Sequence, residues 1–111
     1  MALQMSNTYV KSKINTYKDN EVLAATPGEL VLMLYDQAIL ACKTANQAKA
    51  STALAELVNS LNFDYEISAG LFRLYDYGIR MVKKDQFDEV TAILVELRQA
   101  WKKALESLQA A

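Results

Sequence analysis

Hydrophobic residues recur every three or four positions through most of this chain, a spacing that predicts amphipathic helices. The clearest start signal is Thr26-Pro27-Gly28-Glu29. Thr26 and Glu29 have the spacing of a capping box, and Pro27 takes the first helical position. We expect this helix to continue to about Ala50. Its apolar positions form two adjacent stripes, which is typical of a helix that packs on two sides in a bundle. The second stripe contains Val31, Tyr35, Ile39 and Cys42.

Three further helices are predicted downstream, each after a polar residue that can serve as its N-cap. Ser51 and Thr52 are expected to cap a helix over 51–62, Asp64 one that ends at Lys83-Lys84, and Asp85 one that runs to Leu108. The last two have apolar residues at near-heptad spacing, and short loops favour antiparallel neighbours. The sequence therefore predicts an all-α fold, an antiparallel four-helix bundle whose second helix is about half as long as the first and last.

Residues 1–25 lack this regular pattern. Val10, Ile14 and Tyr17 have the spacing of about two helical turns, and so short a helix is marginal on its own. We expect a short capping segment that lies in a groove of the bundle, with a frayed terminus as the alternative. The predicted organisation is an N-terminal capping segment, 1–25, and a helical bundle domain, 26–111.

Composition excludes most kinds of chemistry. There is no His and one Cys among the 111 residues, so zinc sites, di-iron sites with Glu-x-x-His pairs and Ser-His-Asp triads are not available. We predict no enzymatic activity, no cofactor and no metal. Twelve Lys plus Arg against 13 Asp plus Glu, interspersed along the chain, form no basic stripe for nucleic acid. No apolar run approaches the ~20 residues of a membrane span, and the N-terminus lacks the features of a signal peptide. We expect a cytoplasmic protein.

Five residues leave a choice between a structural and a functional reading. Asp36 and Asp76 each follow a Leu-Tyr pair and predict either ion pairs with Lys or Arg or a paired acid site. Gly70 and Gly78 lie inside a helix, where each costs ~1 kcal/mol relative to Ala. They indicate close approach of either a neighbouring helix or a bound peptide. Cys42 is expected to be a small buried hydrophobic residue.

The run Ala25-Thr-Pro-Gly-Glu-Leu-Val-Leu-Met-Leu-Tyr-Asp-Gln-Ala38 resembles the flagellar secretion chaperones of the FliS family. Three shorter matches occur in the order that the family has. Ile14-Asn-Thr-Tyr17 lies before this run, and Leu74-Tyr75-Asp76-Tyr77 and the segment 97–105 around Trp101 lie after it. The resemblance implies an export chaperone that binds the disordered C-terminal region of flagellin and prevents premature polymerisation. It also implies delivery of that client to the cytoplasmic domain of the export-gate protein.

The client segment is predicted to contact one apolar groove. We expect its lining to include Val31, Tyr35, Ile39, Leu71, Leu74 and Tyr75. The resemblance implies that the N-terminal segment leaves its groove when the client binds, and that Ile14 and Tyr17 then contact the export gate. Similar proteins carry roughly ten more residues between Ala50 and Ser51, enough for a full-length second helix. The alternative function is a structural bundle that self-associates, for example as a weak homodimer.

Overall fold

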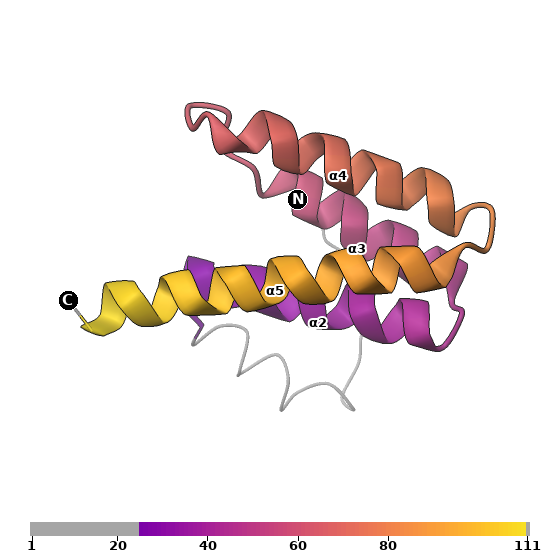
Figure 1. The fold of residues 1–111 in the computed structure, drawn as a ribbon, viewed down its shortest axis with the longest axis horizontal. Helices are drawn as coiled ribbons and strands as arrows, with labels where there is room; N and C mark the ends of the chain where they lie inside the picture. The colour runs from indigo at the N-terminus through magenta and orange to yellow at the C-terminus, as the bar shows by residue number, and fades with distance from the viewer. Residues whose placement is uncertain (1–24, 111) are drawn as a thin grey trace. The chain divides into compact units, whose positions relative to one another are not determined.

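The computed structural model describes residues 25–110, with side chains as far as residue 108. This range holds four α-helices and no strand: α2 (Pro27–Lys43), α3 (Gln47–Asn59), α4 (Ile67–Val82) and α5 (Phe87–Ala110). The described residues from Val31 onward form one compact unit. Within it, successive helices run in opposite directions (Figure 1). The prediction of an all-α, antiparallel four-helix bundle is therefore confirmed for this part of the chain.

The core is built from two tyrosines and from small and branched side chains, and all four helices contribute to it. Its buried members are Tyr35, Ala38, Ala41, Cys42, Ala50, Ala53, Leu54, Leu57, Tyr75, Val82, Val90 and Leu94. Gly78 lies where three helices meet, because a Cβ added there would stand 3.4 Å from Leu54 Cδ1 and 3.5 Å from Val90 Cγ1. Gly78 therefore faces side chains of neighbouring helices at ordinary contact distance, and no backbone among the described residues approaches it closely enough to require a glycine. A Cβ at Gly70 would meet nothing within 4 Å, so no helix approaches that glycine closely.

The capping box at the start of α2 forms as predicted. The Thr26 N–H donates to Glu29 Oε1 at 2.9 Å, and the Glu29 N–H donates to Thr26 Oγ1 at 3.2 Å. Each side chain thereby satisfies one of the backbone donors that a helix N-terminus leaves without an intrahelical partner.

The predicted boundary between the first two helices is wrong. The first helix ends at Lys43, not near Ala50, and α3 runs without a break across Ala50–Ser51. Asn46 is the N-cap of α3, where its side chain accepts a hydrogen bond from the Lys49 N–H, so Ser51 and Thr52 cap nothing. With 13 residues α3 is the shortest of the described helices, as predicted. The first helix has only 17 residues, however, and α5 with 24 is the long member.

The turn between α2 and α3 explains why this boundary was missed. Ala45 adopts a left-handed backbone with φ of 53°. The Asn46 N–H donates to Ala41 O at 2.8 Å and the Ala45 N–H to Cys42 O at 3.1 Å. This is the Schellman arrangement, which usually has glycine at the left-handed position. Because alanine stands there, the sequence carries no glycine signal for the end of the helix.

The turn between α4 and α5 repeats the same geometry. Asp85 has a φ of 59°, and the Gln86 and Asp85 N–H groups donate to Met81 O and Val82 O, both at 3.0 Å. Asp85 therefore belongs to this turn, and the prediction that it caps the last helix is wrong, since α5 begins at Phe87. Gln47 links the two turns, because its amide donates to Val82 O at 3.0 Å.

The third helix also starts later than predicted. Asp64 does not cap it: α4 begins at Ile67, and its N-cap Glu66 makes no capping hydrogen bond through its side chain. The buried Ser68 hydroxyl instead donates to Asn62 O at 2.6 Å. The first turn of α4 is thus fastened to the loop that precedes it.

The left-handed alanine leads to a stability prediction. An L-residue with a side chain pays ~1–2 kcal/mol in this conformation, and glycine does not. We expect Ala45→Gly to raise the free energy of unfolding by about 0.5–1 kcal/mol, measured by urea denaturation. Ala55→Gly, at an exposed position inside α3, is the control and should lower stability by about 1 kcal/mol. A destabilised Ala45→Gly chain would contradict this account of the turn.

Candidate functional site

Two of the predicted site residues form a buried pair between α2 and α4. The Tyr35 and Tyr75 side chains are each 2% exposed, and their hydroxyl oxygens are 2.5 Å apart. The rings meet edge to face, with centroids 6.2 Å apart and planes at 61°. Each hydroxyl is thereby provided with a partner inside the core, where an unsatisfied one would cost about 1–3 kcal/mol.

Burial also changes the acidity of these phenols. Desolvation raises the pKa of Tyr35 well above its usual value, and the hydrogen bond with Tyr75 raises it further. Desolvation likewise raises the pKa of Tyr75, against a smaller lowering from its bond with Tyr35. Both rings are therefore neutral throughout the physiological range of pH.

The other predicted client residues lie around this pair with different exposure. Val31, Ile39 and Leu71 are partly buried and pack against the core, whereas Leu74 is 38% exposed. The structure therefore brings Tyr35 and Tyr75 into contact but gives neither ring an open surface. The placement of a client on the six residues remains a prediction.

One side of α4 carries a row of apolar residues that is exposed at Ile67 and Leu74 and partly buried at Leu71. Ile67, Leu71 and Leu74 are spaced i, i+4 and i+7 and so lie on one face of the helix. Gly70 belongs to the same face, and the space above it is open. We call these four residues the α4 strip. Ile67 is 68% exposed; we did not predict it as a site residue, although its seven-residue spacing to Leu74 was a usable signal.

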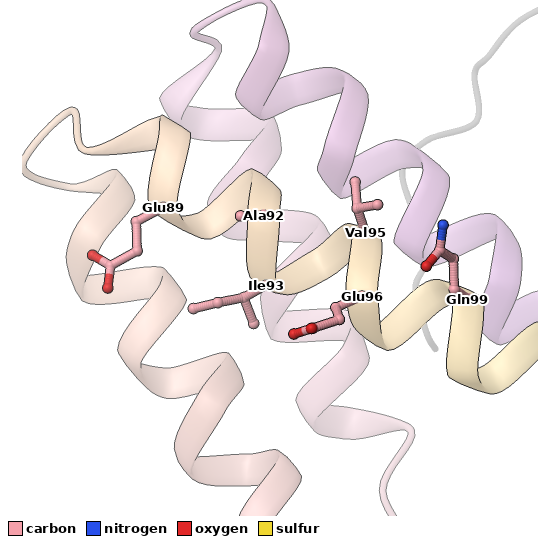
Figure 2. A pocket seen from close by; sticks show the side chains of 6 residues that line it. All are labelled: Glu89, Ala92, Ile93, Val95, Glu96 and Gln99. Carbon is pink, nitrogen blue, oxygen red and sulfur yellow. The ribbon is translucent and has the colours of Figure 1, made fainter.

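A shallow depression lies on α5. It is lined by Glu89, Ala92, Ile93, Val95, Glu96 and Gln99. Figure 2 shows Glu89 and Ile93 pointing toward α4, and Val95 toward α2. The Tyr77 hydroxyl is 2.8 Å from both Glu89 carboxylate oxygens, so this edge of the depression is tied to α4. Ile93 was not among the predicted site residues, because it falls outside the heptad positions of its helix.

Ion pairs account for the two aspartates that follow the Leu-Tyr pairs. Asp36 on α2 accepts from Arg98 Nε on α5 at 2.5 Å, and Asp76 lies 3.4 Å from Arg80 Nε one turn along α4. The ion-pair reading is confirmed, and the two aspartates do not form a paired acid site. The Arg98–Asp36 pair joins α2 to α5 at an exposed position.

Of the remaining candidates, Cys42 is part of the core, and Ile14 and Tyr17 fall outside the described residues. Cys42 is buried, as predicted, and burial raises the pKa of its thiol. Phe63 and Phe72 stack edge to face near the α3–α4 loop, 61% and 40% exposed. Across the range 25–110, no helix is long and apolar enough to span a membrane.

An all-helical bundle with an exposed apolar strip is typical of a protein that binds other polypeptides. Comparison with known proteins makes this specific. The family model described as "Flagellar protein FliS" matches residues 10–108. The chain is also 33% identical to the flagellar secretion chaperone FliS of Bacillus subtilis (strain 168), over 88% of this chain and 90% of the relative. The chain therefore belongs to the FliS family, as the resemblance of its motifs predicted.

The comparison also bears on the residues that similar proteins carry and this chain lacks. The matched stretch with the Bacillus protein covers 119 positions, more than the 111 residues of this whole chain. The relative therefore carries residues inside the match that have no counterpart here.

The buried tyrosine pair predicts how stability depends on pH. Unfolded tyrosine loses its proton near pH 10, but in the folded chain the pKa of both phenols is raised. Above pH 10 the unfolded state thus binds fewer protons than the folded state does. The free energy of unfolding is therefore at its full value below about pH 9 and declines as the pH rises further. The decline approaches ~1.4 kcal/mol per pH unit for each phenol.

This slope is measured by urea denaturation between about pH 8 and 11.5. The control is the double variant Tyr35→Phe/Tyr75→Phe, which keeps all the lysines and the other tyrosines. Its decline should be shallower than that of the unmodified chain. Two parallel curves would show that these phenols are not protected from ionisation in the folded state.

Proposed function

We propose that this chain is a flagellar secretion chaperone that binds the C-terminal region of flagellin through the apolar α4 strip. The observation that carries the proposal is membership of the FliS family together with an exposed apolar face on α4. Ile67 and Leu74 are 68% and 38% exposed. A disordered amphipathic segment can fold against such a face as a helix, burying its own apolar side chains at spacings of three and four residues.

The client complex is proposed to act in the bacterial cytoplasm and to dock on the cytoplasmic domain of the export-gate protein. Binding of the flagellin segment there would keep subunits from polymerising before export. Contact is expected to be mainly apolar, because the α4 strip contains no charged side chain. No step of this function requires a cofactor or a chemical reaction.

Substitutions in the α4 strip test the client surface. Leu74→Ala and Ile67→Ala each remove apolar area that the client would bury. We expect each to weaken binding of a flagellin C-terminal peptide by about 1 kcal/mol, or about fivefold in Kd. Isothermal titration calorimetry measures the affinity, and circular dichroism checks that the helices persist.

Two controls make this test specific. Leu108→Ala removes a 74% exposed leucine from α5, outside the strip, and should leave Kd unchanged. Phe72→Ala disrupts the exposed Phe63–Phe72 pair, the feature that most favours the self-associating alternative. If the α4 variants bind as well as the Leu108 control, the client does not use this strip. If only Phe72→Ala changes the mass in light scattering, the self-associating bundle is supported instead.

The N-terminal segment is proposed to act as a replaceable lid. Val10, Ile14 and Tyr17 supply one apolar face, and a segment that competes with the client lowers the apparent affinity by the cost of displacing it. We expect deletion of residues 1–20 to tighten binding of the flagellin peptide and to weaken docking of the complex on the export gate. Both affinities can be measured by calorimetry. Weaker flagellin binding after the deletion would instead make the segment a clamp on the client.

A further inference from the structure

The α4 helix that carries the strip packs mainly on α3, and its first turn is fastened by the bond from the Ser68 hydroxyl to Asn62 O. Toward α5, the specific contacts of α4 lie near the α4–α5 turn, where Tyr77 bonds to Glu89 and Gly78 meets Val90. Toward α2, the described polar contact is the bond between Tyr75 and Tyr35. Tyr75 is adjacent to Leu74 in sequence and one helical turn from Leu71. Any rotation of α4 that moves Tyr75 therefore moves the strip.

The Tyr35–Tyr75 hydrogen bond depends on the orientation of α4, whereas the apolar contacts around it depend on orientation much less. Apolar burial is non-directional, so a helix can rotate by small angles at little cost if its buried area is preserved. An O–H···O bond weakens steeply with distance and angle. Both hydroxyls are buried and one hydrogen bond joins them, so a rotation of α4 that separates them breaks this bond inside the core.

We propose that Tyr35 and Tyr75 are positioning residues for client binding: their buried hydrogen bond fixes the rotation of α4 that presents Leu71 and Leu74 to the client. This inference rests on the proposed function, but it assigns the tyrosines an indirect part instead of the direct contact with the client that the sequence led us to expect. Each ring is 2% exposed, so they act through the orientation of the strip and not by touching the client. The partner they serve is the same apolar amphipathic helix.

The effects of substituting the two tyrosines should therefore not be additive. Tyr35→Phe or Tyr75→Phe alone leaves one buried hydroxyl without a partner, and α4 can relieve this by turning that hydroxyl toward water. Replacing both leaves no orphan group and keeps two rings of nearly the same shape in contact. The single variants should disturb the strip, and the double variant should restore it.

The experiment is a double-mutant cycle on client affinity, with each chain held at a temperature where circular dichroism shows it folded. Each single variant should bind the flagellin C-terminal peptide about fivefold to twentyfold more weakly, and the double variant should return to within about twofold of the unmodified chain. Tyr77→Phe is the matched control. It removes a hydroxyl hydrogen bond from the same helix at an exposed position, and it should leave affinity unchanged.

A second readout follows the strip without any client. In methyl NMR spectra, each single variant should shift the Leu71 and Leu74 resonances, the double variant should restore them, and Leu108 should not move. If the unmodified chain fails to bind the peptide, the proposed function fails while these resonances still report on positioning. Unchanged affinities and resonances in the folded single variants would overturn the positioning role. Losses that simply add in the double variant would instead indicate direct contact between the hydroxyls and the client.

Discussion

The hydrogen bond between Tyr35 and Tyr75 is a directional contact inside the core of this bundle, and it is the constraint from which the proposed orientation of α4 follows. It joins α2 to α4, which are separated in sequence by the whole of α3, and it lies among alanines, leucines and valines that pack without directional preference. A buried polar pair adds little net stability when both members are satisfied, but it penalises every arrangement in which they are apart. We propose that this constraint, together with packing at Gly78, sets the rotation of α4 and with it the presentation of Leu71 and Leu74.

Two tight turns also constrain how the helices are arranged. The left-handed residues Ala45 and Asp85 each end a helix in the same hydrogen-bonding pattern, and Gln47 ties one turn to the helix end of the other. Close packing of α4 against α3 and α5 at Gly78 then fixes that part of the bundle. The opposite half of α4 is free of such close contact at Gly70. A closely packed region and an open apolar strip thus occur on the same helix.

The helical class, the bundle, the capping box and the family could all be predicted from the sequence because local chemistry determines them. Thr26 and Glu29 carry their capping signal within four residues, and the near-heptad spacing identifies the apolar stripe of a helix. The boundary at Lys43 could not be predicted in this way, since Ala45 gives no hint of a left-handed conformation that glycine would have signalled. The caps assigned to Ser51, Asp64 and Asp85 failed for a related reason: a polar residue can cap a helix, but only packing decides where the helix begins.

At the candidate site, too, the sequence identified residues by their local motifs but did not show how neighbouring helices bury them. Tyr35 and Tyr75 were singled out by their motifs, and the structure brings them together, but burial depends on contacts between residues 40 positions apart. An amphipathic pattern identifies an apolar stripe without telling which part of it neighbouring helices cover. For that reason Leu71 and Leu74 were expected at the site while the more exposed Ile67 was overlooked, and Ile93 was missed on α5.

The central claim is that the α4 strip holds the C-terminal region of flagellin, and site-specific photocrosslinking tests it most directly. A photoreactive amino acid would replace Leu74, which is 38% exposed, or the more accessible control Leu40, which is 64% exposed on α2, in cells that assemble flagella. Mass spectrometry would then identify the crosslinked peptides. The account predicts crosslinks from position 74 to the C-terminal region of flagellin, well above those from position 40. Equal yields at the two positions, or crosslinks only to other regions of flagellin, would contradict it.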